Sequence, residues 1–82
     1  MRRPLIAEEE ILAAIVVLAD DGFCRRDQLT LRFRTTGERE LRRSLGRASR
    51  RGLVLERRGP EGRAYFAVSS EGWELLRSRS GT

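Results

Sequence analysis

The sequence has no histidine, no lysine and no asparagine, and it has a single cysteine, Cys24. Without histidine and lysine it lacks the usual general base of enzymes and their usual Schiff-base or phosphate-binding amine. One cysteine cannot form an internal disulfide, and without histidine it cannot complete a thiolate–imidazole metal site. We therefore expect no catalytic residue, no metal and no cofactor, and we interpret Cys24 as a small buried hydrophobe rather than a redox sensor.

The remaining polar residues do not form a nucleotide-enzyme motif. Glu8, Glu9 and Glu10 open an apolar helical run, where acids interact favourably with the positive end of the helix dipole. Gly59 and Gly62 bracket a Pro-Glu pair in a tight turn and match neither the Walker pattern nor the dinucleotide fingerprint. The sequence indicates no small-molecule ligand.

Long hydrophobic runs are also missing. The longest, residues 11–19, is too short to span a bilayer, and the glutamates of residues 8–10 come too early for a signal peptide. A chain of 82 residues has room for one small domain with a modest core. We expect a single domain over residues 1–82 with a loose tail at about 78–82, located in the cytoplasm and associated with the nucleoid if the source is prokaryotic.

Arginine, in contrast, is abundant. All 17 basic residues are arginine, and the net charge is +5. Residues 1–24 have two arginines and five acids, residues 25–63 have 13 and five, and residues 64–82 have two and two, so that the charges are −3, +8 and 0. This uneven distribution favours a polyanionic partner, most often nucleic acid. The alternative is a basic face that contacts only solvent.

The first strongly periodic segment predicts a helix over about residues 6–19. Its core face consists of Ile11, Ala14, Ile15 and Leu18. The opposite side has Ala13, Val16 and Val17 where a surface helix should be polar, so that another element must cover it. That element is either the chain's own C-terminal helix or the same helix of a second subunit. Gly22 is suited to the left-handed cap that ends the helix.

Two shorter helices are predicted next. Asp27 is expected to cap the first of them, in which Leu29 and Phe33 lie four residues apart. Thr35 and Glu38 have the spacing of a capping box at the start of the second.

This third helix, at about residues 36–51, is predicted to have one apolar and one basic stripe. Leu41, Leu45 and Ala48 repeat at intervals of four and three and form the buried stripe. The side nearly opposite consists of Arg39, Arg43 and Arg50, with Arg47 beside them and Arg42 on the flank. Like charges on one face destabilise a helix by a few tenths of a kcal/mol per close pair, and neutralisation by phosphates is the simplest compensation. Gly46 also faces outward, where it would permit a partner backbone to approach closely.

The rest of the chain predicts a hairpin and a last helix. Residues 53–58 and 63–68 form the two strands, with arginines at the tip. Tyr65 and Phe66 are neighbours in the second strand and point to opposite faces, so that one is in the core and only the other could stack on a base. Ser69 or Ser70 caps the last helix. Its apolar residues are Trp73, Leu75 and Leu76.

The fold is therefore expected to be mainly α with a small two-stranded β-hairpin, an α+β protein. The order of helix, helix, basic helix, basic-tipped hairpin and helix resembles the winged helix-turn-helix family of transcriptional regulators over nearly the whole chain. The resemblance is carried by Arg-Gly-Leu-Val at 51–54, Glu-Arg-Arg at 56–58, Gly-Arg-Ala-Tyr-Phe at 62–66 and the segment 68–76. One departure is the turn Phe-Arg-Thr-Thr before the third helix, which lacks the family's usual glycine and places Gly37 late.

The resemblance implies that the helix at about 36–51 enters the major groove and that the wing, at about 53–69, touches the flanking backbone or the minor groove. The residues implied in base contact are Thr36, Arg39 and Arg43. The residues implied in phosphate contact are Arg42, Arg47, Arg25 and Arg26. Two further residues flank the wing, where a narrow minor groove attracts arginine, namely Arg58 and Arg63.

The expected function is sequence-specific binding of double-stranded DNA by a small transcriptional regulator without a cofactor. We expect a homodimer on a pseudo-palindromic site, formed through the outer face of the first helix and the C-terminal helix; a monomer in which the last helix covers that face would satisfy the same pattern. The alternative function is a winged-helix module for protein assembly, or an architectural nucleic-acid-binding module, within a larger complex.

Overall fold

The computed structural model describes residues 6–80. Within them the chain forms four α-helices, a three-stranded antiparallel sheet and one short 3₁₀ turn, so that the fold is of the α+β class. The elements are, in order, α1 (Glu8–Leu18), β1 (Cys24–Arg25), α2 (Arg26–Arg32), α3 (Glu38–Arg50), β2 (Val54–Arg58), the 3₁₀ turn Pro60–Gly62, β3 (Ala64–Val68) and α4 (Ser70–Ser80). None of these described helices is both long enough and apolar enough to cross a membrane. The ends of the domain predicted over residues 1–82 lie outside the described residues.

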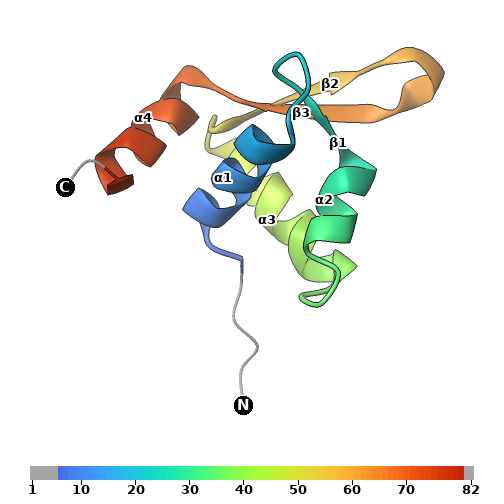
Figure 1. Cartoon of the computed structure of the whole chain (residues 1–82), viewed down its shortest axis with the longest axis horizontal. Coiled ribbons are helices and arrows are strands. Elements are labelled where there is room, and N and C mark those ends of the chain that lie inside the picture. The colour runs from blue at the N-terminus through green and yellow to red at the C-terminus, as the bar shows by residue number, and fades with distance from the viewer. Residues whose placement is uncertain (1–5, 81–82) are drawn as a thin grey trace.

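The sheet has three strands, in the order β1-β3-β2, rather than the two that the sequence predicted. β2 and β3 form the predicted hairpin, which reaches beyond the helices (Figure 1). β1 pairs with the other edge of β3, where Cys24 lies opposite Phe66 and Arg25 lies opposite Tyr65. The sequence does not predict this strand because two residues are too few to show an alternation of apolar and polar positions.

A tight turn leads the chain from α1 into β1. α1 ends at Leu18, and shortly afterwards the Asp20 amide donates to the Phe23 carbonyl (2.8 Å) while the Phe23 amide donates to the Asp20 carbonyl (3.2 Å). Asp21 and Gly22 between them have φ values of 57° and 87°, and a type I′ turn requires two such positive values. Gly22 is thus left-handed, but the prediction that it caps the helix is wrong, because it belongs to this turn.

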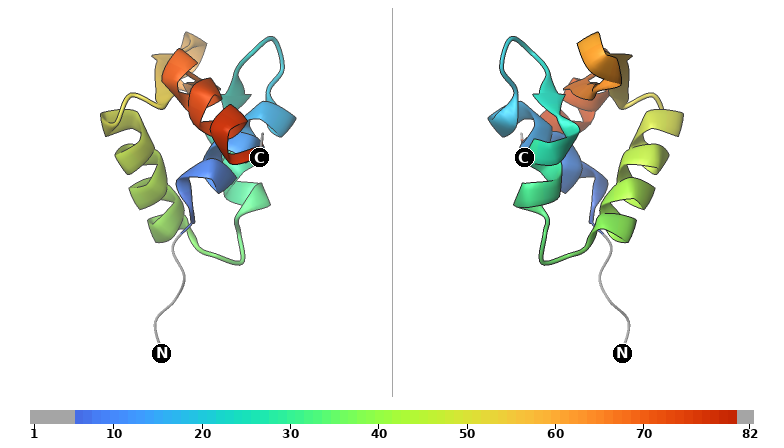
Figure 2. Two further views of the ribbon diagram at one scale, coloured as in Figure 1. Left: turned by 90° about the vertical axis from the view of Figure 1, so that its left-hand side faces the viewer. Right: turned by 90° about the vertical axis from the view of Figure 1, so that its right-hand side faces the viewer.

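The core lies between the sheet and the helices, whose arrangement is shown in Figure 1 and Figure 2. Its most completely buried side chains are Ile11, Leu12, Ile15, Cys24, Leu29 and Leu41. The stripe predicted for α3 is confirmed, because Leu41, Leu45 and Ala48 are all buried. The face predicted for α1 is also buried except for Leu18, which is half-buried, and Leu12 adds to it.

Cys24 is a core residue, as expected. Its side chain is fully buried. Burial raises the pKa of the thiol to about 11. The thiol is therefore protonated at neutral pH, where a redox-sensing or nucleophilic cysteine would need a thiolate.

The start of α2 differs from the predicted one. Asp27 does not precede the helix as a cap but lies within its first turn. The residue before the helix is Arg25, whose amide donates to Gln28 Oε1 (2.8 Å). The Gln28 side chain thus accepts a hydrogen bond at the start of α2, where Asp27 was expected to act as the cap. The Asp27 carboxylate still lies favourably near the positive end of the helix dipole.

The start of α3 also differs. The helix runs over 38–50 instead of about 36–51, and no side-chain hydrogen bond caps it within the described residues, so that the capping box predicted for Thr35 and Glu38 is wrong. Gly37 precedes the helix with a φ of 109°, a value that other residues adopt only at a cost. The family resemblance led us to expect a glycine earlier in the turn before α3. In this chain Gly37 provides the positive φ at the end of that turn.

α4 is fixed to the sheet by its cap. Ser69, one of the two residues predicted for this role, accepts a hydrogen bond from the Gly72 amide at its Oγ (3.1 Å), and its own amide donates to the Leu53 carbonyl (3.0 Å). α4 continues to Ser80, through positions where the sequence predicted a loose tail; residues 81–82 of that tail lie outside the described part. The rest of the hairpin matches the predicted bounds to within one residue.

Gly72 permits α4 to lie directly on the β2 end of the sheet. A Cβ atom at this position would overlap the Leu53 carbonyl oxygen and lie 2.7 Å from Val68 Cγ1. Gly46, which lies within α3, would place a Cβ atom in open space. The two helical glycines therefore differ in their surroundings and not in their secondary structure.

We predict opposite effects of alanine at these two glycines. Gly72→Ala should lower the free energy of unfolding by about 1–3 kcal/mol, because backbone at the contact has to move. Gly46→Ala should raise it by up to about 1 kcal/mol, since alanine is the better helix former and nothing obstructs it. Urea unfolding followed by circular dichroism measures both. Equal shifts in the two variants would contradict the close contact between α4 and Leu53.

Candidate nucleic-acid interface

α3 presents a basic side to solvent because its apolar side is buried. Arg39, Arg42, Arg43 and Arg50 are exposed and Arg47 is half-buried. All five guanidinium groups belong to the stripe that the sequence predicted opposite the leucines. In Figure 2, α3 stands at the edge of the molecule with one side turned away from the other elements. We name these five residues the α3 arginines.

Only one of the α3 arginines has an acidic partner among residues 6–80. Glu38 Oε2 lies 4.0 Å from Arg42 Nη2, one turn along the helix, and 3.0 Å from Arg26 Nη2 of α2. No ion pair joins the other four to a carboxylate in the described part of the chain. The predicted shortage of acids on this side is therefore real, and the charge of four guanidinium groups is available to an external anion.

Thr36 does not lie on the helix with these arginines. It is half-buried in the turn that joins α2 to α3, and its amide donates to the Phe33 carbonyl (3.0 Å). Since α3 begins at Glu38, Thr36 precedes the helix by two residues. The structure thus places this candidate beside the start of the basic stripe rather than within it.

A groove of about 760 Å³ runs between α2 and the start of β3. Its lining consists of Arg25, Arg26, Asp27, Thr30, Leu31, Arg34, Arg63 and Ala64. The groove thus brings together three predicted site residues from distant parts of the sequence, Arg25, Arg26 and Arg63. Sequence reasoning missed Arg34, because this arginine belongs to no periodic element and only its place in the basic segment 25–63 pointed to it.

The charges in this groove are mostly positive. Arg25 Nε donates to Asp27 Oδ1 (3.0 Å), and this hydrogen bond holds the pKa of the Asp27 carboxyl below its usual range. Asp27 is therefore ionised at neutral pH and offsets one of the arginines. Of the other three arginines, Arg26 is paired with Glu38 and Arg63 with Glu61, so that Arg34 alone lacks an acidic partner within residues 6–80. An exposed Leu31 also lines the groove.

The hairpin arginines are partly engaged within the hairpin. Arg58 Nη1 donates to the Gly62 carbonyl (2.9 Å), and Arg58 Nη2 lies 3.9 Å from Glu56. Arg63 Nε lies 3.6 Å from Glu61. Ion pairs this exposed contribute about 0–1 kcal/mol each, so that phosphate can replace the carboxylates.

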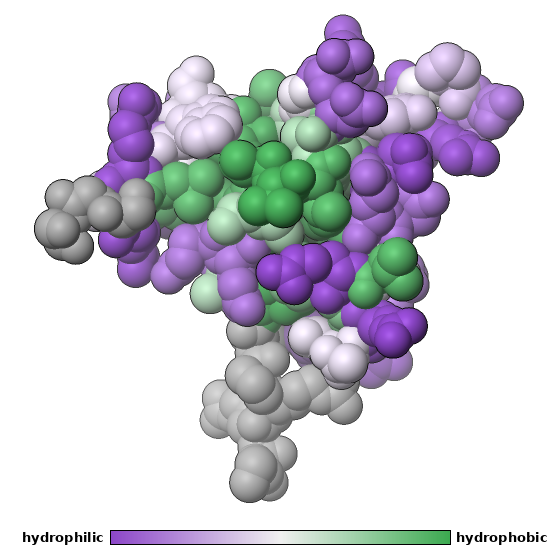
Figure 3. Space-filling view, in the orientation of Figure 1, coloured by the Kyte–Doolittle hydropathy of each residue, from purple (hydrophilic) through white to green (hydrophobic). Residues whose placement is uncertain are grey.

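The face that carries α1 is apolar instead of basic. Val16, Val17 and Trp73 are 36%, 77% and 45% exposed. Leu75 and Leu76 of α4 pack against the core, so that the chain's own helix covers α1 only in part. Figure 3 shows the resulting patch in green over α1. Beside it is an open pocket of about 250 Å³, lined by Ile15, Val16, Ala19, Gly22, Val68 and Trp73.

No group of acidic, histidine or cysteine side chains among the described residues could hold a metal ion. No protein-family model matches the chain, and comparisons with curated proteins and with solved structures find no match either. The interface is therefore interpreted from its own residues.

Proposed function

We propose that this protein is a small transcriptional regulator that binds double-stranded DNA in a sequence-specific manner, with a winged helix-turn-helix fold. The observation that supports this most is the set of four α3 arginines that have no acidic partner within residues 6–80. Their mutual repulsion destabilises the free helix, and DNA phosphates would relieve it. An exposed α-helix also has the width that the major groove of B-DNA admits.

In this proposal the first half of α3 reads bases. Arg39 and Arg43 are one helical turn apart and both exposed, so that they reach the groove floor together. Each can donate two hydrogen bonds to O6 and N7 of a guanine, which discriminates against other bases by about 1–3 kcal/mol. Thr36, just before the helix, is positioned for a shorter contact. Arg42 and Arg47 lie toward the phosphates.

The groove between α2 and β3 would hold the flanking DNA backbone. From the sequence, Arg25 and Arg26 were expected to contact phosphates and Arg63 to flank the wing near a narrow minor groove; Arg34 lines the groove with them. Phosphate contacts of this kind fix the orientation of a protein on the duplex without reading its sequence. The β2–β3 hairpin is the wing, whose Arg58 would lie against the backbone or in a narrow minor groove. The proposed activity is binding alone, without a catalytic step, a metal or a cofactor.

We further propose that the regulator is a homodimer that contacts itself through α1 and α4. The apolar patch around Val17 and Trp73 is left uncovered by the chain's own α4, and the neighbouring pocket could receive a projecting side chain of a second copy. None of the α3 arginines belongs to this patch or to its pocket, so that dimer contact and DNA contact use different residues. A two-fold dimer matches the pseudo-palindromic sites of helix-turn-helix regulators.

The DNA proposal predicts different roles for Arg43 and Arg58. On a duplex selected from a random pool, Arg43→Ala should lower affinity by about fivefold or more, and on random duplex much less, because base-edge contacts are lost. Arg58→Ala should lower both affinities by the same factor, since a backbone contact is lost. Fluorescence anisotropy with the two duplexes measures this. Parallel losses in both variants would show that Arg43 does not read bases.

The dimer proposal predicts a mass of two chains by size-exclusion chromatography with light scattering at micromolar concentration. Val17→Glu should shift the mass to that of one chain, because a charge would be buried in the contact. Leu31→Glu is the matched control, since it changes an exposed leucine outside the patch and should leave the mass unchanged. A wild-type mass of one chain would refute the dimer.

A further inference from the structure

The outer face of the sheet carries a second pocket, which shares only Arg25 with the groove proposed for the DNA backbone. It has a volume of about 300 Å³, at the small end of the range of ligand pockets in proteins. It lies where β1, β3 and the turn of residues 20–23 meet. Its lining consists of Asp20, Asp21, Phe23, Arg25, Gln28, Arg57 and Tyr65.

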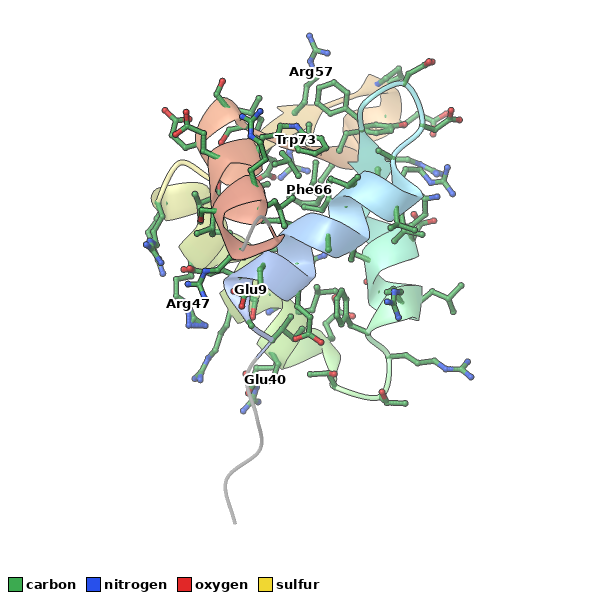
Figure 4. All side chains as sticks on the ribbon, turned by 60° about the vertical axis from the view of Figure 1, so that its left-hand side comes forward. Glu9, Glu40, Arg47, Arg57, Phe66 and Trp73 are labelled. Carbon is green, nitrogen blue, oxygen red and sulfur yellow. The ribbon has the colours of Figure 1, made fainter. Side chains whose placement is uncertain are left out.

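Strand register places three of these residues in one row. Arg25 of β1 and Arg57 of β2 lie opposite Tyr65 of the central strand, on either side of it. The next residue, Phe66, points to the other face and is buried in the core. Figure 4 shows this division, with Phe66 between the sheet and the helices and Arg57 projecting away from them. Of the two neighbouring aromatics, Tyr65 is therefore the one on the outer face.

Two aromatic residues, Phe23 and Tyr65, line the pocket, and Arg57 lies against one of them. The Arg57 guanidinium lies 5.2 Å from the centre of the Phe23 ring, within the range of a cation–π contact. Tyr65 is half-buried and packs over Gly59, where a Cβ atom would lie 3.0 Å from Tyr65 Cδ1. The contact with Gly59 restrains the Tyr65 ring, so that it offers a prepared surface on which a flat heterocycle can stack.

The rim of the pocket holds hydrogen-bond acceptors and donors close together. The Asp20 and Asp21 carboxylates have no hydrogen bond or ion pair to a side chain among residues 6–80. Gln28 Oε1 accepts from the Arg25 amide (2.8 Å), so that the Nε2 group of this pocket residue remains as a donor. Arg57 has no ion pair in the described part of the chain. Two carboxylates thus share the pocket with the Gln28 amide and two guanidinium groups, of which Arg25 is already hydrogen-bonded to Asp27 and Arg57 is not paired with a carboxylate within residues 6–80.

We propose that this pocket binds a guanine nucleotide. Guanine has adjacent N–H donors, which suit a carboxylate, next to the acceptors O6 and N7, which suit a guanidinium or an amide. Its ring stacks on Tyr65, and its phosphate lies toward Arg57, whose guanidinium has no ion pair in the described part of the chain. Adenine presents no such pair of N–H donors to a carboxylate, so that the aspartates discriminate against it.

The proposed ligand has two sources, a free nucleotide or a guanosine within a single strand. Both would use the same stacking and the same hydrogen bonds. The pocket does not include any of the α3 arginines, and the turn that forms its rim lies on the side opposite α3 in Figure 2. Binding here therefore shares only Arg25 with the contacts proposed for a duplex.

Isothermal titration calorimetry of the full chain tests the proposal, with GMP, AMP and a short single-stranded oligonucleotide that contains one guanine among thymines. We expect GMP or the oligonucleotide to bind, and guanine to bind about tenfold or more tightly than adenine in the same setting. Binding of GMP identifies the free nucleotide as a sufficient ligand, whereas binding of the oligonucleotide alone identifies the single strand; both support the site. Binding of neither at millimolar concentration would overturn the proposal.

Three variants assign the binding to this pocket. Tyr65→Leu and Arg57→Gln should each weaken binding by about tenfold, and Arg57→Gln keeps the test valid if loss of the Tyr65 ring disturbs the fold. Asp20→Asn combined with Asp21→Asn should reduce the preference for guanine over adenine. Arg77→Gln, which removes an exposed arginine of α4 outside the pocket, is the control for charge alone and should leave nucleotide binding unchanged. Equal losses in Arg77→Gln and Arg57→Gln would show non-specific attraction and overturn the assignment.

Discussion

The burial of one side of α3 is the constraint on which the rest of the surface depends. Leu41, Leu45 and Ala48 lie in the core, and each buried leucine contributes about 1.5–3 kcal/mol. Turning the helix by one residue would expose them and bury guanidinium groups that have no partner, at a far larger cost. The repulsion within the α3 arginines amounts only to tenths of a kcal/mol per pair. Burial therefore wins over repulsion, and the basic stripe is held outward in a fixed register.

The central strand β3 likewise separates a buried face of the sheet from an exposed one. Phe66 faces the core and Tyr65 faces outward, and the strand pairs on both edges, with β1 and with β2. The core is thereby closed by one side of the sheet, while the other side is left with a row of two arginines and a tyrosine. Three distinct surfaces result, namely the α3 arginines, the apolar patch over α1 and the outer face of the sheet. Each proposal rests on a different one of them.

Hydrophobic periodicity predicted the helices, the hairpin and the buried stripes, because the spacing of apolar residues follows which side of each element is buried. Local capping patterns were less reliable: Asp27 and Thr35 were expected to cap helices, but Gln28 and the positive φ of Gly37 define those ends instead. The strand β1 and the positions of Arg34 and Arg57 depend on pairing between distant segments, which a single sequence does not reveal. The nine residues assigned to DNA from the sequence stay predictions, with Thr36 now placed before the helix.

The salt dependence of duplex binding tests the central proposal most directly. Affinity for a random double-stranded DNA pool would be measured across a salt series. Each phosphate neutralised contributes a slope of about −0.9 to the plot of log affinity against log salt, so that the unpaired α3 arginines predict a slope of about −3 or steeper. No measurable duplex binding, or binding that salt does not weaken, would contradict a DNA-binding regulator and favour a module for protein assembly.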